Sequence, residues 1–164
     1  MRSVIQQFSQ LMVKSSCTIK SEAGVVCAQN KETFQKDEPM AGVRGDESPL
    51  SYLQATVCYY ELFKYDKSNQ DSWSYERILD DSFIKNLEIV GMWPFEPSRK
   101  SLNPIFFYDS LHHPVVIFYT IQGDEEKYIQ KHIHRFDCEG YNLKVGTRVF
   151  KYIEDSSIPW ERMS

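Results

Sequence analysis

The sequence predicts a single α+β domain, in which an antiparallel sheet of four to six strands is covered by one or two helices. The chain has 164 residues, enough for one domain with its own core. Apolar residues make up 41% and charged residues 26%, a balance typical of globular proteins. Apolar runs of strand length dominate the C-terminal third, whereas helical periodicity occurs mainly nearer the N-terminus. These observations favour a sheet-based core with some helical cover.

Residues 1–28 predict an amphipathic helix followed by a small hairpin. Apolar side chains recur at the spacing of one helical face, at Val4, Ile5, Phe8, Leu11 and Met12. Residues 17–20 and 25–28 are rich in β-prone types and flank a turn that ends in Gly24. The helix either packs on its own domain or is offered to a partner, and the pattern allows both.

Residues 29–48 predict a flexible surface loop, because charged, amide and turn-forming types prevail without a sustained period. Ser48 and Pro49 then match the N-cap and first position of a helix. The segment that follows is ambiguous. Helical spacing links its apolar residues, but β-branched and aromatic residues crowd its second half. A helical turn followed by a strand over residues 55–65 is the prediction.

The α+β core is expected over residues 49–155, and residues 156–164 are expected to form a polar tail. A helix from Ser74 to about Val90 is predicted to cover one face of the sheet. Residues 127–136 fit a strand as well as they fit a helix. Three apolar runs predict further strands, namely residues 105–108, 115–121 and 143–153.

The chain shows no secretory signal and no run of about 18 apolar residues that would predict a membrane span. We therefore expect an intracellular protein, cytoplasmic or nuclear, whose four cysteines are reduced. A net charge of −4 argues against a nucleic-acid partner held through its phosphates. Neither a phosphate-binding glycine loop nor a nucleophile elbow occurs, so the sequence predicts no cofactor apart from the metal considered next.

A metal site is the first alternative to a purely structural role for the C-terminal histidines. On a strand, His132 and His134 would project to the same face, about 6–7 Å apart. Glu139 follows closely, and imidazole with carboxylate is a ligand set that divalent metals use. On a helix the two imidazoles would point to different sides, and the site would not form.

The run His132, His134, Glu139 and Gly146 resembles the first motif of the cupin barrels. The resemblance implies a divalent metal held by the two histidines and the glutamate. It covers about 15 residues of the chain, and the chain departs from the motif in two ways. The family's glycine before the first histidine is replaced by Glu126, and no histidine follows His134 as a fourth ligand.

Large apolar side chains on connections and chain ends point to contact with another protein, since such residues are typical anchors of interfaces. We therefore predict a non-enzymatic protein–protein interaction module, such as an adaptor, a regulator or a subunit of a complex. Its partner can be a second copy of the same chain, in a homodimer. The predicted partner-binding residues are Phe8, Leu11, Met12, Trp93, Phe95 and Trp160.

Binding of single-stranded nucleic acid by aromatic stacking is a second alternative, because stacked rings bind bases without reading sequence. The nearest candidates are four aromatic residues and two lysines, namely Tyr59, Tyr60, Phe63, Tyr65, Lys64 and Lys67. The acidic balance of the chain weighs against this alternative.

Overall fold

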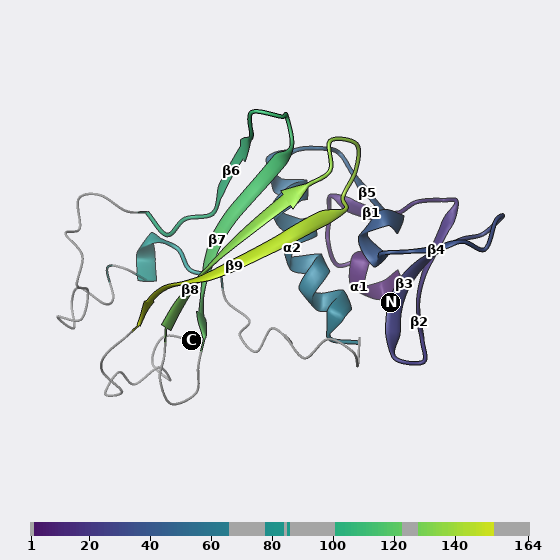
Figure 1. The fold of residues 1–164 in the computed structure, drawn as a ribbon, viewed down its shortest axis with the longest axis horizontal. Helices are drawn as coiled ribbons and strands as arrows, with labels where there is room; N and C mark the ends of the chain where they lie inside the picture. The colour runs from purple at the N-terminus through teal and green to yellow at the C-terminus, as the bar shows by residue number, and fades with distance from the viewer. Residues whose placement is uncertain (1, 66–77, 84, 86–100, 123–127, 153–164) are drawn as a thin grey trace. The chain divides into compact units, whose positions relative to one another are not determined.

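A computed structural model describes residues 2–65, 78–83, 85, 101–122 and 128–152, and it confirms the α+β class (Figure 1). The described strands form three antiparallel sheets, of two, three and four strands. The longest described helix is α2, Pro49–Phe63.

The described residues belong to two compact units. One comprises residues 2–65, 106–116 and 134–145, and the other comprises residues 78–83, 85, 101–105, 117–122, 128–133 and 146–152. We refer to them as the first and the second unit. Strands β7 (Pro114–Gln122), β8 (Tyr128–Phe136) and β9 (Leu143–Tyr152) each contribute residues to both units.

The N-terminal helix is much shorter than predicted. Helix α1 covers only Arg2–Ile5 (Figure 1), and Leu11–Val13 form a strand, β1. Strand β1 pairs antiparallel with β5, Val43–Gly45. The prediction of one helix through Met12 is wrong, because apolar spacing of this kind also fits a helical turn followed by a strand. Pairing with β5, a segment distant in sequence, decides between the two.

The predicted hairpin is confirmed. Strands β2 (Cys17–Glu22) and β3 (Val25–Asn30) pair antiparallel, with Glu22 opposite Val25. Ala23 and Gly24 both have left-handed backbone angles, at φ 53° and 88°. Two such residues in succession match the twist of the flanking strands, which is why short hairpin turns favour this conformation.

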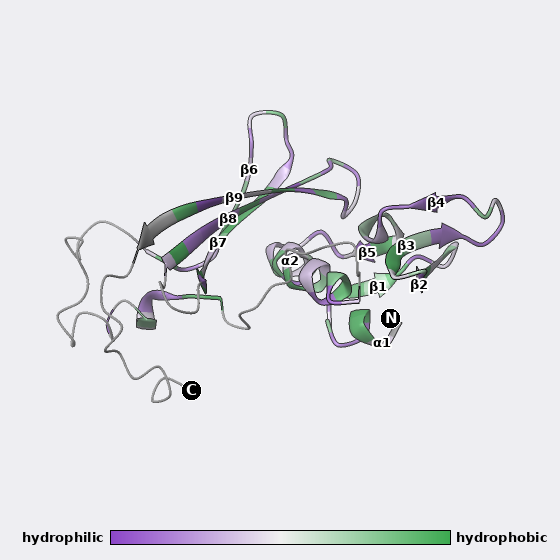
Figure 2. Cartoon of the chain, turned by 60° about the horizontal axis from the view of Figure 1, so that its bottom comes forward, coloured by the Kyte–Doolittle hydropathy of each residue, from purple (hydrophilic) through white to green (hydrophobic). Residues whose placement is uncertain are grey.

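The prediction of a flexible loop over residues 29–48 is wrong for much of its length. The short hydrophilic strand β4 (Lys36–Asp37, Figure 2) pairs with β3, and a 3-10 helix, η1 (Pro39–Gly42), follows it. Met40 is 2% exposed, so this segment reaches the core. A Cβ on Gly42 would lie 2.6 and 2.9 Å from side chains of β2 and β3, so only glycine allows this close approach.

The strand predicted over residues 55–65 is also wrong, because α2 is one continuous helix. Its predicted start is confirmed, since the Ser48 Oγ accepts a hydrogen bond of 3.1 Å from the Ser51 N–H and Pro49 opens the first turn. Burial at helical spacing overrides the β propensity of the aromatic residues. The buried residues of α2 are Ser51, Tyr52, Ala55, Thr56, Cys58 and Leu62.

The four-stranded sheet has the order β6-β7-β8-β9, with β6 at Ile105–Tyr108. Its three predicted runs are confirmed as strands, and the ambiguous segment 127–136 contains strand β8. The predicted cover helix of residues 74–90 lies largely outside the described residues, although residues 81–83 are helical.

Aromatic packing around Tyr52 forms the centre of the first unit. Tyr52 is 3% exposed, and its ring stacks on Phe106 at 5.4 Å and on Tyr141 at 5.0 Å between centroids. Phe136 approaches the same ring at 5.0 Å in a tilted arrangement. Helix α2, strand β6 and the end of β8 are thus held together by one buried ring.

In the second unit, the Asp81 carboxylate accepts hydrogen bonds from three residues of the segment that precedes β6. Its Oδ1 accepts hydrogen bonds from the Leu102 N–H at 2.8 Å and from the Ser101 hydroxyl at 2.9 Å. Its Oδ2 accepts from the Asn103 amide at 2.9 Å. The backbone of Leu79 also donates to the carbonyl of Tyr119 at 2.8 Å, which attaches this segment to β7.

Candidate interaction surface

Strand β6 exposes large apolar side chains at an edge of the four-stranded sheet. Phe106 faces inward, where it stacks on Tyr52. Phe107 and Tyr108 are 40% and 53% exposed, and Leu111 in the following turn is 65% exposed. Among the described residues, no strand pairs with the outer edge of β6. An exposed, apolar edge strand is a template for pairing with another chain.

The turn between β6 and β7 is fixed by Asp109. The backbone closes it with two hydrogen bonds, from the Asp109 N–H to the His113 carbonyl at 3.0 Å and from the His112 N–H to the Asp109 carbonyl at 2.9 Å. The Asp109 Oδ1 also accepts from the N–H groups of Leu111 and His113, each at 2.9 Å. These bonds hold His112 at φ 60°, a left-handed conformation that is unfavourable for histidine.

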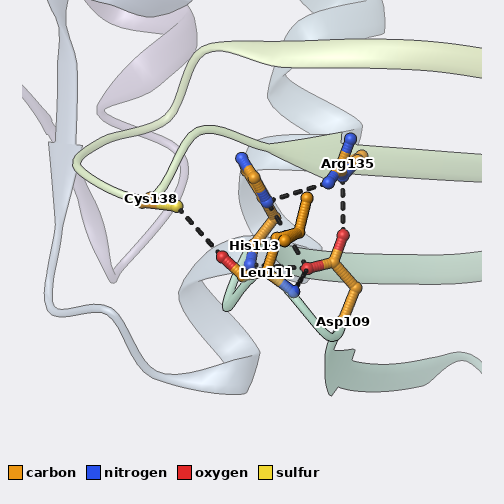
Figure 3. Close-up of polar contacts among 5 residues, drawn as sticks. All are labelled: Asp109, Leu111, His113, Arg135 and Cys138. Carbon is orange, nitrogen blue, oxygen red and sulfur yellow. Dashed lines mark hydrogen bonds and ion pairs between the residues drawn. The ribbon is translucent and has the colours of Figure 1, made fainter.

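Arg135 on β8 clamps this turn from the neighbouring strand (Figure 3). Its Nε donates to the Asp109 Oδ2 at 2.7 Å, and its terminal nitrogen lies 2.9 Å from the His113 Nδ1. A guanidinium can only donate, so this Nδ1 must accept and the imidazole proton must sit on Nε2. The 3.4 Å approach of the same Nδ1 to the Asp109 Oδ1 is then not a hydrogen bond.

The surroundings of Asp109 favour its charged form. Burial raises the pKa of this carboxyl, but the N–H groups of His113 and Leu111 and the Arg135 guanidinium outweigh burial and bring the pKa from 3.8 to about 2. The carboxylate therefore stays charged, and the clamp stays closed, through the neutral and mildly acidic range.

A third link ties the turn to the loop between β8 and β9. The Cys138 thiol, a free cysteine, donates to the Leu111 carbonyl at 3.7 Å (Figure 3). The backbone of Leu111 is thus held by Asp109 on its N–H and by Cys138 on its carbonyl, while its side chain is exposed. We call the exposed side chains of Phe107 and Tyr108 on β6, together with that of Leu111 in the turn, the hairpin surface.

The structure describes three of the six predicted partner-binding residues, and their exposure differs. Leu11 is 5% exposed and belongs to the core, whereas Met12 beside it on β1 is 50% exposed. Phe8 is half-buried just after α1. The remaining three, Trp93, Phe95 and Trp160, lie outside the described residues.

The predicted metal ligands occupy alternate, buried positions of β8, except for Glu139. His132 is 3% exposed, and its ring stacks on Phe118 at 4.6 Å and 9°. Its Nε2 lies 2.8 Å from the Thr120 hydroxyl. Burial lowers the pKa of His132 from 6.5 to about 4, so the imidazole is neutral at physiological pH.

His134 is fully buried and its Nε2 lies 3.0 Å from the Tyr60 hydroxyl, while Glu139 is exposed in the loop that follows β8. Among the described residues, no three His, Cys, Asp or Glu side chains form a group that could hold a metal ion. Each histidine instead makes a hydrogen bond to a hydroxyl, which is the usual environment of a buried histidine in a core.

Of the candidate stacking residues for nucleic acid, Tyr59, Tyr60 and Phe63 lie on α2. Lys67 lies outside the described residues. Tyr59 contacts Phe63 at 4.5 Å and Tyr60 at 5.3 Å between ring centroids. Tyr59 and Tyr60 also contact the His134 ring, at 5.9 and 5.4 Å. Tyr65, just beyond the helix, is 54% exposed. Tyr59 and Tyr60 thus pack against the His134 ring of β8, whereas Tyr65 is exposed.

Sequence reasoning missed the clamp that shapes the hairpin surface. Asp109 at the start of a turn was a signal, because aspartate accepts from backbone N–H groups two and more residues on. Nothing in the sequence links Asp109 to Arg135, since their contact depends on the pairing of β7 with β8.

Comparison with known proteins yields no match to any protein-family model, to any curated protein or to any solved structure. Within the described part of the chain, no helix combines the length and the apolar character needed to cross a membrane.

Proposed function

We propose that this chain is a protein–protein interaction module that binds its partner through the hairpin surface. The observation that carries the proposal is the exposure of Phe107, Tyr108 and Leu111, at 40%, 53% and 65%, on an edge strand and its turn. Aromatic and aliphatic side chains of this kind supply most of the binding energy of protein interfaces.

The geometry favours binding by strand addition. The outer edge of β6 offers backbone N–H and carbonyl groups to an incoming strand, and the exposed side chains add apolar burial. Completing the burial of each side chain contributes about 1 kcal/mol, because part of each is already covered in the free chain. The links through Asp109, Arg135 and Cys138 fix the turn beforehand, so that binding costs little additional ordering of the backbone.

A matched pair of leucine substitutions tests the proposal. Leu111 and Leu50 belong to the same unit and are 65% and 50% exposed, but Leu50 lies on α2, away from the hairpin turn in sequence. Both variants, Leu111→Ser and Leu50→Ser, remove the same apolar side chain. Partners are captured from the native cell with tagged full chain, quantified by mass spectrometry, and self-association is measured by light scattering.

We expect Leu111→Ser to reduce a defined set of captured proteins, or the dimer fraction, about tenfold, while Leu50→Ser retains them. A tenfold loss corresponds to about 1.4 kcal/mol. If the two variants and the wild type capture the same proteins at the same level and have the same mass, the hairpin surface is not the binding site and the proposal is wrong.

A further inference from the structure

The hairpin of β6 with β7 determines which backbone groups of β6 point to its open edge. The Asp109 N–H donates to the His113 carbonyl at 3.0 Å, so this N–H points towards β7. Successive residues of an antiparallel strand direct their backbone groups to alternate sides. Phe107 therefore also bonds towards β7, whereas Phe106 and Tyr108 direct their N–H and carbonyl groups to the open edge.

The side chains of β6 alternate between the two faces of the sheet. The rings of Phe106 and Tyr108 meet edge to face at 5.3 Å between centroids, and Phe106 also stacks on Tyr52 of α2. Both rings therefore lie on the face that packs against α2, and Phe107 projects from the opposite face. A strand added at the open edge keeps this alternation, because residues directly opposite each other share a face.

The open edge of β6 lacks the charges that usually prevent pairing between copies of a chain. Residues Ile105–Tyr108 carry no charged side chain. The edge strands β2 and β9, in contrast, carry Lys20 and Lys144, and charges of this kind oppose edge-to-edge pairing. The charge that follows β6, on Asp109, is paired with Arg135. Two copies of β6 can therefore approach each other without bringing unpaired like charges together.

We propose that the hairpin surface binds a second copy of this chain, through antiparallel pairing of the two β6 strands about a two-fold axis at Phe107. The inference rests on the proposed function and names its partner. In this register Phe106 of each copy lies opposite Tyr108 of the other, and each such pair exchanges both of its backbone hydrogen bonds. Every N–H and carbonyl group that β6 directs to its open edge is thereby bonded.

Neighbouring registers do not satisfy this edge. A slip of one residue would place Phe106 opposite Phe107, and so would oppose side chains of different faces. With the axis at Phe106, Tyr108 would lie opposite Pro104, which has no N–H to donate. With the axis at Tyr108, Phe106 would lie opposite Ser110, which belongs to the turn. The backbone therefore favours the axis at Phe107.

The area available indicates a weak, transient dimer. An aromatic side chain covers about 150–250 Å², so the exposed parts of Phe107 and Tyr108, 40% and 53%, amount to about 100 Å² each. Their sum over two copies lies well below the roughly 1,200 Å² of a stable complex. Sedimentation velocity of the full chain is therefore measured from about 10 µM to 1 mM, the range in which transient complexes form.

A charge swap at residue 107 tests the axis, because this residue then faces itself. Phe107→Lys and Phe107→Glu are compared with the wild type, and Leu50→Lys and Leu50→Glu, at a position 50% exposed on α2, are the matched controls. We expect the wild type and both controls to dimerise as the concentration rises. Each Phe107 variant alone should dimerise at least tenfold more weakly, because like charges meet directly across the strands.

An equimolar mixture of Phe107→Lys and Phe107→Glu should restore the dimer, because opposite charges then meet at the axis. Recovery in the mixture also shows that both variants are folded. Binding of an unrelated protein at this surface would not produce such a rescue, since only a second copy presents residue 107 to residue 107.

Cysteine substitutions test the register independently. In the proposed pairing the two Cα atoms of residue 107 lie about 4.5 Å apart, within the range of a disulfide, so Phe107→Cys should link to itself under mild oxidation. The Cα atoms of residue 108 would lie about 8 Å apart, too far for a bridge, so Tyr108→Cys should not. Mass spectrometry of the linked peptides distinguishes these bridges from any made by the native cysteines.

A wild type that keeps the mass of a single chain at every concentration would overturn this inference. Unweakened dimerisation of Phe107→Lys, no recovery in the mixture, or linkage through Tyr108→Cys in place of Phe107→Cys would do the same. If the wild type is monomeric but Leu111→Ser still loses captured proteins, the hairpin surface binds a different protein. The proposed function then stands, and only the second copy as its partner is refuted.

Discussion

Replacement of His132 by glutamine tests whether this histidine is a neutral core residue. The ring is 3% exposed, stacks on Phe118 and contacts the Thr120 hydroxyl. The Gln122 amide donates to the same hydroxyl at 3.0 Å. The Thr120 hydroxyl can therefore donate its own hydrogen to the imidazole Nε2, which accepts it. A proton added at this nitrogen would displace that bond and place a charge in the core.

The magnitude follows from the two pKa values of His132. Burial lowers the pKa from 6.5 in the unfolded chain to about 4 in the folded chain. Between these values the unfolded chain binds a proton that the folded chain does not, so stability is lost as the pH falls from 6.5 to about 4. The full effect is about 3 kcal/mol, and about 2 kcal/mol of it is reached at pH 5.

Urea denaturation of the wild type and His132→Gln at pH 7.5 and pH 5 measures this contribution. We expect the wild type to lose about 2 kcal/mol more of its free energy of unfolding between the two pH values than the variant does. All other titrating groups are shared by both proteins, so the difference isolates His132. In parallel, the ring Cε1–H shift of His132 should titrate near pH 4.

Equal pH dependence of the wild type and His132→Gln would refute this reasoning. A His132 ring that titrates near 6.5 would do the same, because it would show that the imidazole is not desolvated. Such a ring would also be accessible to a metal, which would return His132 to consideration as a ligand.

Three further substitutions test the supports of the first unit. Asp109→Ala should raise the exchange rates of the Leu111 and His113 amides about tenfold, by hydrogen-exchange NMR, since both N–H groups lose their acceptor. In the wild type this protection should persist at pH 3 and be lost towards pH 2, because the pKa of Asp109 lies at about 2. Gly45→Ala should lower the free energy of unfolding in urea by about 1–3 kcal/mol, because its Cβ would lie 2.8 Å from the Tyr141 ring. Tyr141→Phe should lower it by about 1–3 kcal/mol, through loss of the hydroxyl's two hydrogen bonds of 2.7 and 2.9 Å. An unchanged exchange rate or unfolding midpoint would contradict the role assigned to each residue.

The sequence predicts those parts of the fold that local chemistry determines. Ser48 and Pro49 indicate a helix start because both act within one turn, and the hairpin of residues 17–30 follows from its turn. The strands of the C-terminal third follow from dense apolar runs. These features need no knowledge of distant contacts.

Tertiary contacts decide where the sequence misleads. Leu11 belongs to a strand because Val43–Gly45 lies beside it, and Met40 is buried although most residues from 29 to 38 are charged, amide or turn-forming types. In α2, aromatic residues with strand propensity occupy a helix because its buried face packs around Tyr52. Averages over a local window cannot detect any of these partners.

The sequence predicts a binding surface, but it does not predict where in the fold that surface lies. An excess of aromatic residues indicated a binding surface, and β6 was predicted as a strand. The edge position of β6, however, depends on the order of strands in the sheet. The clamp of Arg135 on Asp109 depends on the same order, and it is this clamp that turns an apolar run into a fixed, exposed surface.

Site-specific photo-crosslinking tests the role of the hairpin surface most directly. A benzoylphenylalanine introduced at Tyr108, which is 53% exposed on β6, is compared in the native cell with one at Leu50, which is 50% exposed on α2. We expect position 108 to form a discrete crosslink to one protein, or to a second copy of this chain, and position 50 to form none. Crosslinks of equal yield and pattern at the two positions, or none at position 108, would contradict the account.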